Sequence, residues 1–344
     1  MTATYQKHTL NFKQASGTSR GILKTKDTWF IIIASEDKKG IGECGMFRGL
    51  SVDDRPDFES VLSWTCKNIF LGKEVLLSKL KEFPSIQFGL EMAFLDLQSE
   101  VDFDLFPSKF TKGKDAIPIN GLIWMGSEDF MREQITSKIE EGFTCIKLKI
   151  GAIDFQTELD LLKSIRTHFS ATDIELRVDA NGAFSPEEAL EKLKRLSDYQ
   201  LHSIEQPIKQ GQVEEMARLC QTTPLDIALD EELIGIFEDN KKHDLLQTIK
   251  PQYIILKPTL VGGFQGSKSW IDAAQAGNID YWITSALESN VGLNAIAQWT
   301  YTLQNNRPQG LGTGGLFSNN IDSPLEVHNG ALQYNRKTNW NFNL

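Results

Sequence analysis

Polar residues recur at nearly constant intervals along this chain from residue 149 onward, and each one closes a short apolar run. They are Lys149, Asp179, Glu205, Asp230, Lys257 and Ser285. Neighbouring members of the series are 25 to 30 residues apart, which is the length of one strand followed by one helix. Because the carboxyl ends of all the strands of a parallel barrel open on one face, we expect these side chains to converge.

The runs themselves predict a (β/α)8-type barrel. Eight β-rich segments follow residue 115, at 116–123, 145–150, 174–180, 201–207, 226–232, 253–258, 281–286 and 309–315. Helical segments separate most of them, and the clearest begins at Ser185, with Pro186 in the first turn and Glu188 completing a capping box. A doubly wound open sheet is the alternative, but no G-x-G-x-x-G motif follows the first strand.

The first 115 residues have a different pattern, which predicts a separate α+β unit. The run Thr28–Ser35 is rich in β-branched and aromatic residues, and the glycine-containing run Lys38–Gly45 follows it. Together they predict an antiparallel hairpin. From Asp57 to Glu100 the apolar residues recur at helical spacing.

The net charge and the spacing of the cysteines limit the partners and the cellular compartment that we expect for this protein. The 344 residues carry a formal charge of −10, which disfavours nucleic acid and anionic membranes as partners. The four cysteines are scattered without metal-ligand spacing, so reduced thiols are expected. The beginning of the chain has no signal-peptide pattern, and no apolar run reaches membrane-spanning length. We therefore expect a cytoplasmic protein with a small-molecule partner, and the sequence predicts no oligomeric state.

Side-chain alternation places the charged residues on one side of the predicted strands. In the run 145–150, Ile146, Leu148 and Ile150 share one face, whereas Lys147 and Lys149 share the other. The same alternation puts Asp179, Glu205 and Asp230 at the barrel mouth. Three carboxylates that converge in a dry site repel one another unless a cation neutralises them. Oxygen ligands alone predict Mg²⁺, with Mn²⁺ as a substitute.

The lysines suggest the chemistry. Beside a divalent cation and one another, Lys147, Lys149 and Lys257 should have lowered pKa values, so that one of them can act as a neutral base near pH 7. This arrangement suits removal of a proton next to a carboxylate, because a metal can stabilise the enolate that forms.

These motifs resemble those of the enolase superfamily, in its muconate-lactonizing subgroup. The matching segments are KLK at 147–149, VDAN at 178–181, IEQP at 204–207, LDE at 229–231 and LKP at 256–258. The resemblance implies a modified (β/α)7β barrel over residues 116–315, with its active site at the carboxyl ends of the strands. It also implies a capping domain over residues 1–115 that about residues 316–344 complete.

Three further features are similar to the o-succinylbenzoate synthase family of menaquinone biosynthesis: INGLIWM at 119–125, Arg177, and SALESNVGL at 285–293. Members dehydrate SHCHC, a succinyl-substituted hydroxycyclohexadiene carboxylate, in a Mg²⁺-dependent syn elimination. The resemblance implies that Lys149 is the base, that Lys257 stabilises the enediolate, and that Lys147 assists them.

The same resemblance implies which residues bind the metal and the substrate. The metal ligands would be Asp179, Glu205 and Asp230. The substrate-binding residues would be Asn120, Arg177, Ser285 and Glu288, with Ser19, Arg20 and the segment Gly45–Leu50 closing over the succinyl tail. The cap segment lacks an expected proline, so the tail contacts themselves are not carried over.

Two alternatives stay open. A racemase of N-acylamino acids or an epimerase of dipeptides would also use lysines on both sides of its substrate. Dipeptide epimerases carry an acidic pair at the eighth strand, where this chain has Gly310–Phe317 without an acid. The other alternative is a catalytically silent binding protein, which the intact set of charged residues disfavours.

Overall fold

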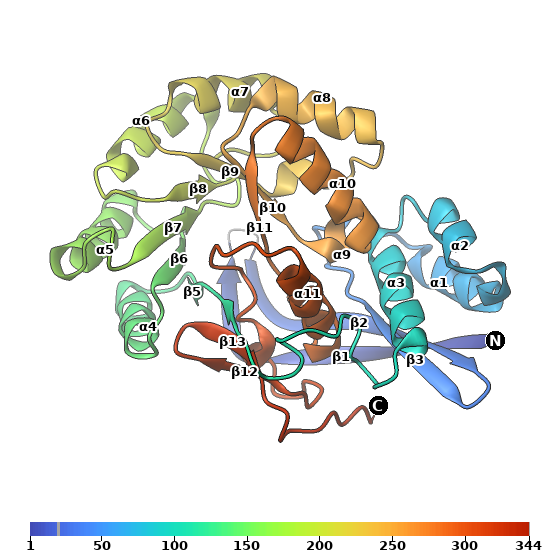
Figure 1. The fold of residues 1–344 in the computed structure, drawn as a ribbon. Coiled ribbons are helices and arrows are strands. Elements are labelled where there is room, and N and C mark those ends of the chain that lie inside the picture. The colour runs from blue at the N-terminus through green and yellow to red at the C-terminus, as the bar shows by residue number, and fades with distance from the viewer. Residues whose placement is uncertain (19–20, 344) are drawn as a thin grey trace.

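The computed structural model describes residues 1–18 and 21–343. Its centre is a seven-stranded parallel sheet with the order β11-β10-β9-β8-β7-β6-β5. The strands are β5 (Gly121–Ile123), β6 (Cys145–Lys149), β7 (Glu175–Asp179), β8 (Ser203–Glu205), β9 (Ile227–Leu229), β10 (Tyr253–Leu256) and β11 (Asp280–Ile283). The sheet curls, and its helices lie on the outer side (Figure 1). The predicted α/β barrel fold with an N-terminal capping unit is confirmed.

One helix follows each strand, as the sequence spacing predicts. These helices are α4 (Glu128–Glu140), α5 (Phe155–His168), α6 (Pro186–Ser197), α7 (Val213–Thr222), α8 (Asp239–Ile249), α10 (Gly263–Ala276) and α11 (Asn290–Thr302), with the short turns η2 (Glu231–Leu233) and α9 (Pro258–Val261). The capping box at Ser185 is present, and its backbone N–H donates to Glu188 Oε1 at 3.2 Å.

The barrel closes differently from the prediction at its first and eighth strands. The run 116–123 divides, because β4 (Ile117–Pro118) pairs with β13 (Ala331–Tyr334) and only β5 joins the central sheet. The segment after Pro308 forms two isolated bridges, Ile119 to Gln309 and Thr284 to Gly310, instead of a full strand. A Cβ on Gly310 would lie 1.7 Å from Thr284 Oγ1, so this glycine permits the close approach that completes the ring.

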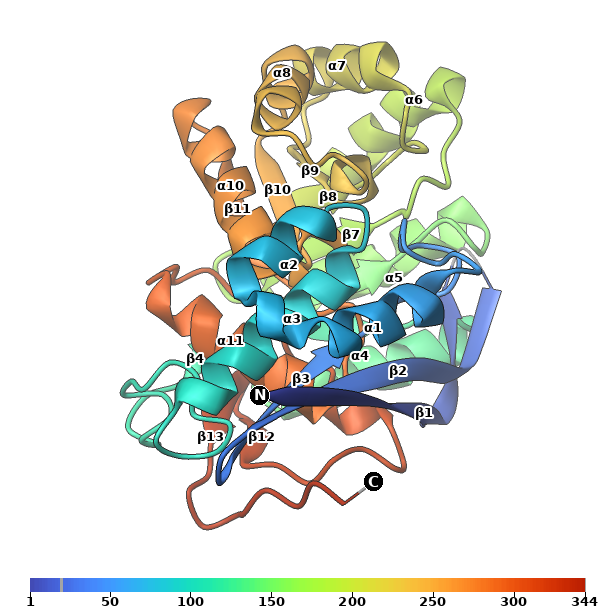
Figure 2. The same ribbon diagram turned by 90° about the vertical axis from the view of Figure 1, so that its right-hand side faces the viewer.

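The N-terminal residues form the cap. Its antiparallel sheet contains β1 (Thr2–Thr18), β2 (Gly21–Ser35) and β3 (Lys38–Cys44), and the helices α1 (Phe58–Lys67), α2 (Lys73–Lys79) and α3 (Pro84–Gln98) follow, with η1 (Ile69–Leu71). The predicted hairpin and helices are confirmed. Figure 2 shows the helices lying across the strands. A Cβ on Gly42 would lie only 1.9 Å from the carbonyl oxygen of Gly89, so β3 and α3 touch through their backbones.

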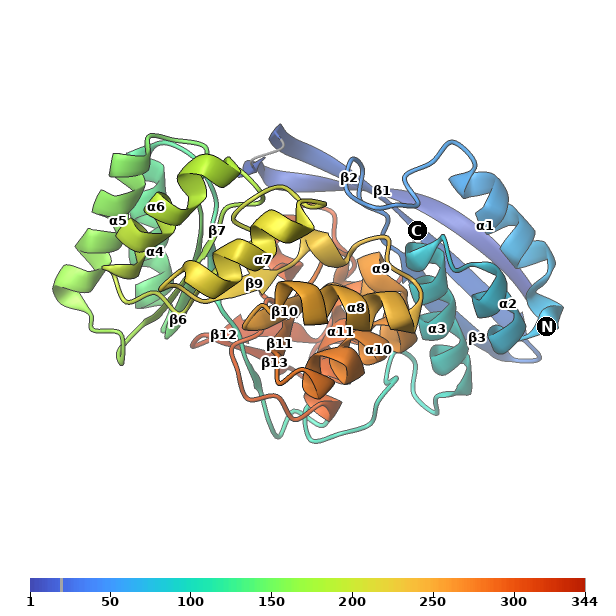
Figure 3. The same ribbon diagram turned by 90° about the horizontal axis from the view of Figure 1, so that it is seen from above.

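The cap packs against one side of the barrel. Helix α3 contacts α9 and α10, and β3 contacts α11 (Figure 3). The C-terminal segment, with η3 (Gly314–Leu316), β12 (Leu325–His328) and β13, returns to the cap. There Phe12 bridges to Phe317, and Asn319 accepts a hydrogen bond from the Asn11 amide at 2.7 Å. The predicted boundaries at residues 115 and 315 themselves stay predictions.

Alternation along the strands separates the apolar core from the polar interior of the barrel. Ile146, Leu148 and Ile150 are buried in the cluster between sheet and helices, which leaves the alternating lysines on the opposite face. Within the part of the chain that the structure describes, we find no helix with the length and apolar character that crossing a membrane requires.

Candidate active site

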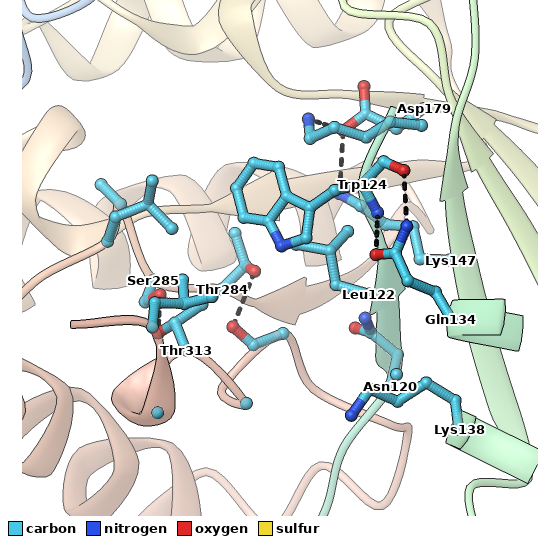
Figure 4. Close-up of a pocket in the computed structure, with 18 of the residues that line it drawn as sticks. Asn120, Leu122, Trp124, Gln134, Lys138, Lys147, Asp179, Thr284, Ser285 and Thr313 are labelled. Atoms are coloured by element: carbon cyan, nitrogen blue, oxygen red, sulfur yellow. Dashed lines mark hydrogen bonds and ion pairs between the residues drawn. The ribbon is translucent and has the colours of Figure 1, made fainter. Parts of the chain in front are cut away.

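A cavity of about 410 Å³ lies at the carboxyl ends of the central strands. Six predicted site residues line it: Lys147, Lys149, Asp179, Lys257, Asn120 and Ser285. Figure 4 shows the indole of Trp124 projecting between Asp179 and Lys147 on one side and the Ser285–Thr313 pair on the other. Residues from strand ends far apart in the sequence therefore meet in one cavity, as their spacing predicts.

The lysine pair on β6 lies against the carboxylates of the next two strands. Lys147 Nζ is 3.0 Å from Asp179 Oδ2 and also pairs with Glu205 Oε2. Lys149 Nζ is 2.9 Å from Asp179 Oδ2 and donates to Asn181 Oδ1 at 2.7 Å. Strand register explains these contacts, because Lys149 is paired with Asp179, and Asp179 with Glu205, across the parallel sheet.

The third lysine directly follows β10, which three other strands separate from β6 in the sheet. Lys257 Nζ pairs with Asp230 Oδ2. The three carboxylates, Asp179, Glu205 and Asp230, are at most 2% exposed. Glu205 and Asp230 do not line the cavity themselves, but each is paired with a lysine that does.

The charges in this site shift one another's pKa values. Burial alone would lower the pKa of Lys147, but Asp179 and Glu205 raise it above its ordinary value. For Lys257 the effect of burial is likewise outweighed, mainly by Asp230, so its pKa is raised. Burial, reinforced by Asp179, raises the pKa of Glu205 to about 8. As the side chains stand, carboxylates hold both lysines as cations. The expectation of lowered lysine pKa values applies to a site with a bound divalent cation and stays a prediction.

The donor set fits a hard divalent cation. The three carboxylates supply oxygen ligands only, from adjacent strand ends, as Mg²⁺ prefers. Glu205 Oε1 is buried and has no hydrogen-bond partner among the residues that the structure describes. However, as these side chains stand, no three His, Cys, Asp or Glu residues within the described ranges are grouped as a metal site. The acids are turned toward the lysines, so the predicted metal site stays a prediction.

Two predicted substrate-binding residues lie away from the cavity. Arg177 is 1% exposed and points toward the lower end of the barrel, where it donates from Nε to Glu175 at 2.7 Å and from Nη1 to the Pro308 carbonyl at 3.0 Å. Its guanidinium also lies over the Trp282 ring, 4.3 Å from the centroid. The side chains of Arg177 and Asp179 lie on the same face of β7, but Arg177 is two residues further from the carboxyl end of the strand. The structure therefore does not support a direct contact between Arg177 and the substrate.

Glu288 likewise does not line the cavity, and its predicted contact with the substrate stays a prediction. It is fully buried and accepts hydrogen bonds from Thr259 Oγ1 and from the Ala286 amide. Alternation does not predict this direction because Leu287 has a positive φ of 61°, which ends the extended backbone after β11. The predicted tail-binding residues Ser19 and Arg20 lie outside the described residues, whereas Phe47 and Leu50 of the predicted cap segment do line the cavity.

The sequence interpretation missed several lining residues. Asn181, named only as part of the VDAN motif, accepts a hydrogen bond from the Lys149 ammonium and donates to Glu231 Oε1 at 3.0 Å. Trp124, named only as part of the INGLIWM motif, lines the cavity. Thr313 shares a 2.6 Å hydrogen bond with Ser285. The available signal was the position of Trp124 and Asn181 directly after predicted strands, and of Thr313 within the last predicted strand.

Comparisons with known proteins agree with this geometry. Residues 130–338 match the Enolase C-terminal domain-like family. The chain is 46% identical to an o-succinylbenzoate synthase of Desulfotalea psychrophila, over 96% of this chain and 98% of that protein. It is 23% identical to the L-Ala-D/L-Glu epimerase of Bacillus subtilis, over 87% of this chain and 82% of the relative.

Solved structures show the same architecture. The crystal structure of MenC from Desulfotalea psychrophila superposes with a TM-score of 0.86 and 44% identity, covering 97% of this chain and 99% of that one. A muconate lactonizing enzyme from Pseudomonas fluorescens superposes with a TM-score of 0.82 at 19% identity, covering 99% and 96%, which is a likeness of fold. The matched family model, the similarity over nearly the whole length of the chain and the shared architecture show that this chain belongs to the enolase superfamily and is an enzyme.

Proposed function

We propose that this chain is an o-succinylbenzoate synthase that removes water from SHCHC, with Mg²⁺ as its cofactor and Mn²⁺ as a substitute. The observation that carries the proposal is the entry of Lys149 and Lys257 into one cavity from strands separated by three others, above buried carboxylates. Similarity over nearly the full length to the Desulfotalea psychrophila enzyme supports the choice of substrate.

The metal would be held by Asp179, Glu205 and Asp230. When bound, it would supply electrostatic stabilisation for negative charge on the substrate carboxylate. It would also compete with Lys147 and Lys257 for the same carboxylate oxygens, which are the partners that now raise the pKa values of these two lysines.

The three lysines would have different roles, and only Lys149 would transfer a proton. Lys149, as a neutral amine, takes the proton from the carbon that bears the carboxylate, and the C–H electron pair moves into the carboxylate to give an enediolate. Lys149 then returns this proton to the hydroxyl group on the same face, which leaves as water while the ring becomes aromatic. Lys257 keeps its proton and stabilises the enediolate charge, and Lys147 holds Asp179 and Glu205 in place.

The cavity fits a small anionic substrate. Its volume of about 410 Å³ is within the range of small-molecule sites. The formal charges of the three lysines and the three buried carboxylates cancel. A bound divalent cation would therefore make the site positive and favour a carboxylate ligand. Phe47, Leu50 and Trp124 add apolar walls that exclude water from the reacting carbon.

Turnover of SHCHC tests the proposal. Purified protein with Mg²⁺ should form o-succinylbenzoate, EDTA should abolish the reaction, and added Mg²⁺ should restore it. Dipeptides and N-acylamino acids serve as comparison substrates, because lysines on two sides could also invert the stereocentre next to a carbonyl group in these compounds. The segment Gly310–Phe317 has no acid to bind a substrate ammonium group, so dipeptide epimerisation should be much slower. Epimerisation without SHCHC turnover would overturn the proposal.

A further inference from the structure

A carboxylate of the cap accepts hydrogen bonds from the start of a barrel helix. Glu43, at the end of β3, is fully buried. It accepts hydrogen bonds from Thr28 Oγ1 at 2.8 Å within the cap, from the Ser289 amide at 2.8 Å and hydroxyl at 2.5 Å, and from the Gly292 amide at 2.8 Å. Ser289 is the N-cap residue of α11. A charge from one part of the chain therefore satisfies the first amides of a helix in the other.

Glu288, which directly precedes Ser289, links the two segments that follow β10 and β11 at the active site. Its Oε1 accepts from Thr259, two residues after Lys257, and its Oε2 accepts from the Ala286 amide at 2.7 Å, directly after Ser285. One buried carboxylate thus holds the chain beyond β10 against the chain beyond β11.

A buried lysine of the cap faces this carboxylate. Lys26, on β2, is 6% exposed, and its Nζ atom has no hydrogen-bond partner within the described part of the chain. A Cβ on Gly45 would lie 3.2 Å from Glu288 Cγ and 3.4 Å from Lys26 Nζ. Lys26 and Glu288 therefore meet at Gly45, which begins the cap segment whose Phe47 and Leu50 line the cavity.

We infer that Glu43, Lys26 and Glu288 form a docking cluster that positions the Gly45–Leu50 segment over the β10–β11 side of the cavity and so sets affinity for the substrate's tail. The inference rests on the proposed function only in naming that tail. These are positioning residues, because their contacts reach the cavity through Gly45, Ala286 and Thr259. Buried carboxylates with several donors hold a fixed geometry, since breaking one contact leaves a charge unpaired.

The chain offers a matched control. Glu91, on α3, also docks the cap on the beginning of a barrel helix, by accepting from the amides of Phe264 at 2.5 Å and Gln265 at 3.1 Å at the start of α10. Glu91 does not line the cavity, and neither do these two partners. A substitution there loosens docking without reaching the cap segment over the substrate.

The experiment compares Glu43→Gln, Glu91→Gln and the milder Ser289→Ala in the full-length protein with Mg²⁺. For Glu43→Gln we expect KM for SHCHC to rise about tenfold with kcat within about twofold of the wild type, because binding rather than chemistry changes. Ser289→Ala should shift KM in the same direction by less, and Glu91→Gln should leave both constants near the wild type. By calorimetry, Glu43→Gln should weaken o-succinylbenzoate but not benzoate.

Hydrogen exchange gives a readout that does not depend on turnover. The amides of Leu50 and Ser51, which donate to the Phe47 carbonyl, should exchange faster in Glu43→Gln than in the wild type or Glu91→Gln. A fall in kcat with unchanged KM, or equal effects of Glu43→Gln and Glu91→Gln in either assay, would overturn the docking role. Absence of wild-type turnover would instead count against the proposed function, and the exchange comparison would still decide the role of the cluster.

Discussion

Lys147 and Lys149 lie two residues apart on one strand, yet their surroundings differ. Lys147 is held between two carboxylates, Asp179 and Glu205, whereas Lys149 has Asp179 and the neutral amide oxygen of Asn181. Burial lowers the pKa of Lys147, but Asp179 and Glu205 outweigh this effect and raise it above its ordinary value, so Lys147 stays a cation. This difference favours Lys149 as the base and Lys147 as a fixed cation.

Replacing Lys149 by Ala should therefore remove catalysis without unfolding the protein. We expect kcat for SHCHC to fall by about a thousandfold or more, in the range typical of a lost general base. Lys149→Arg, which keeps the charge but cannot serve as a neutral base, should be similarly inactive. Circular dichroism and Mg²⁺ calorimetry should remain close to wild type, and a near-native rate in either variant would contradict the assignment.

Arg177 should behave as a structural residue. It is buried, donates to Glu175 and Pro308, and lies over Trp282. Because Arg177→Met leaves the carboxylate of Glu175 without this partner, we expect the free energy of unfolding to fall by about 3 kcal/mol. KM for SHCHC should not change in the folded fraction. A raised KM with unchanged urea denaturation would restore the substrate-binding role.

Alternation along a strand predicts the direction of a side chain but not its depth. Asp179 and Arg177 share a face of β7, and yet the first lines the cavity while the second lies two residues lower. Beyond the end of a strand even direction is lost, as Glu288 after Leu287 shows, and as Asn181 shows with its own φ of 45°. The sequence therefore predicts which side of a strand Lys147, Lys149 and Asp179 occupy. It predicts neither the depth of Arg177 nor the direction of Glu288.

The elements themselves were predictable wherever local signals agreed. Apolar runs of β-branched residues predicted the seven strands of the sheet, and the Ser185 capping box predicted the start of α6. At the eighth position the sequence predicts a strand, whereas the structure has two isolated bridges. This difference was not predictable, because the bridges depend on the distant residues Ile119 and Thr284. Pro118, which lacks an amide donor, stands at the point where the first predicted strand divides between two sheets.

Docking of α3 on α10 should depend on pH. Burial raises the pKa of Glu91 from its ordinary value of 4.5 to about 7, although the Phe264 and Gln265 amides oppose the change. The unfolded chain ionises Glu91 at lower pH than the folded protein does, so stability present below about pH 4.5 is lost as the pH rises through about 7.

Relative to Glu91→Gln, which has no charge to lose, wild-type protein should gain about 2 kcal/mol of unfolding free energy as the pH falls from about 8 to about 5. Urea denaturation of both proteins at the two pH values measures this difference. A difference between the proteins that stays constant, or that shrinks at the lower pH, would contradict the raised pKa.

The cap, barrel and C-terminal segment together enclose one cavity. Phe47 comes from the cap, Lys149 and Lys257 from the barrel, and Val327 from the C-terminal strand β12. The cap is fastened through Glu43 and Glu91 to the helices that follow β11 and β10. Both carboxylates thus hold it on the Lys257 side of the barrel, opposite the lysine pair.

The most direct test of the central claim is a crystal structure of this protein with Mg²⁺ and o-succinylbenzoate. We predict one ion bound by oxygen atoms of Asp179, Glu205 and Asp230. The amines of Lys149 and Lys257 should lie on opposite faces of the bound ring. An ion bound elsewhere, or both lysines on one face of the ligand, would contradict this account.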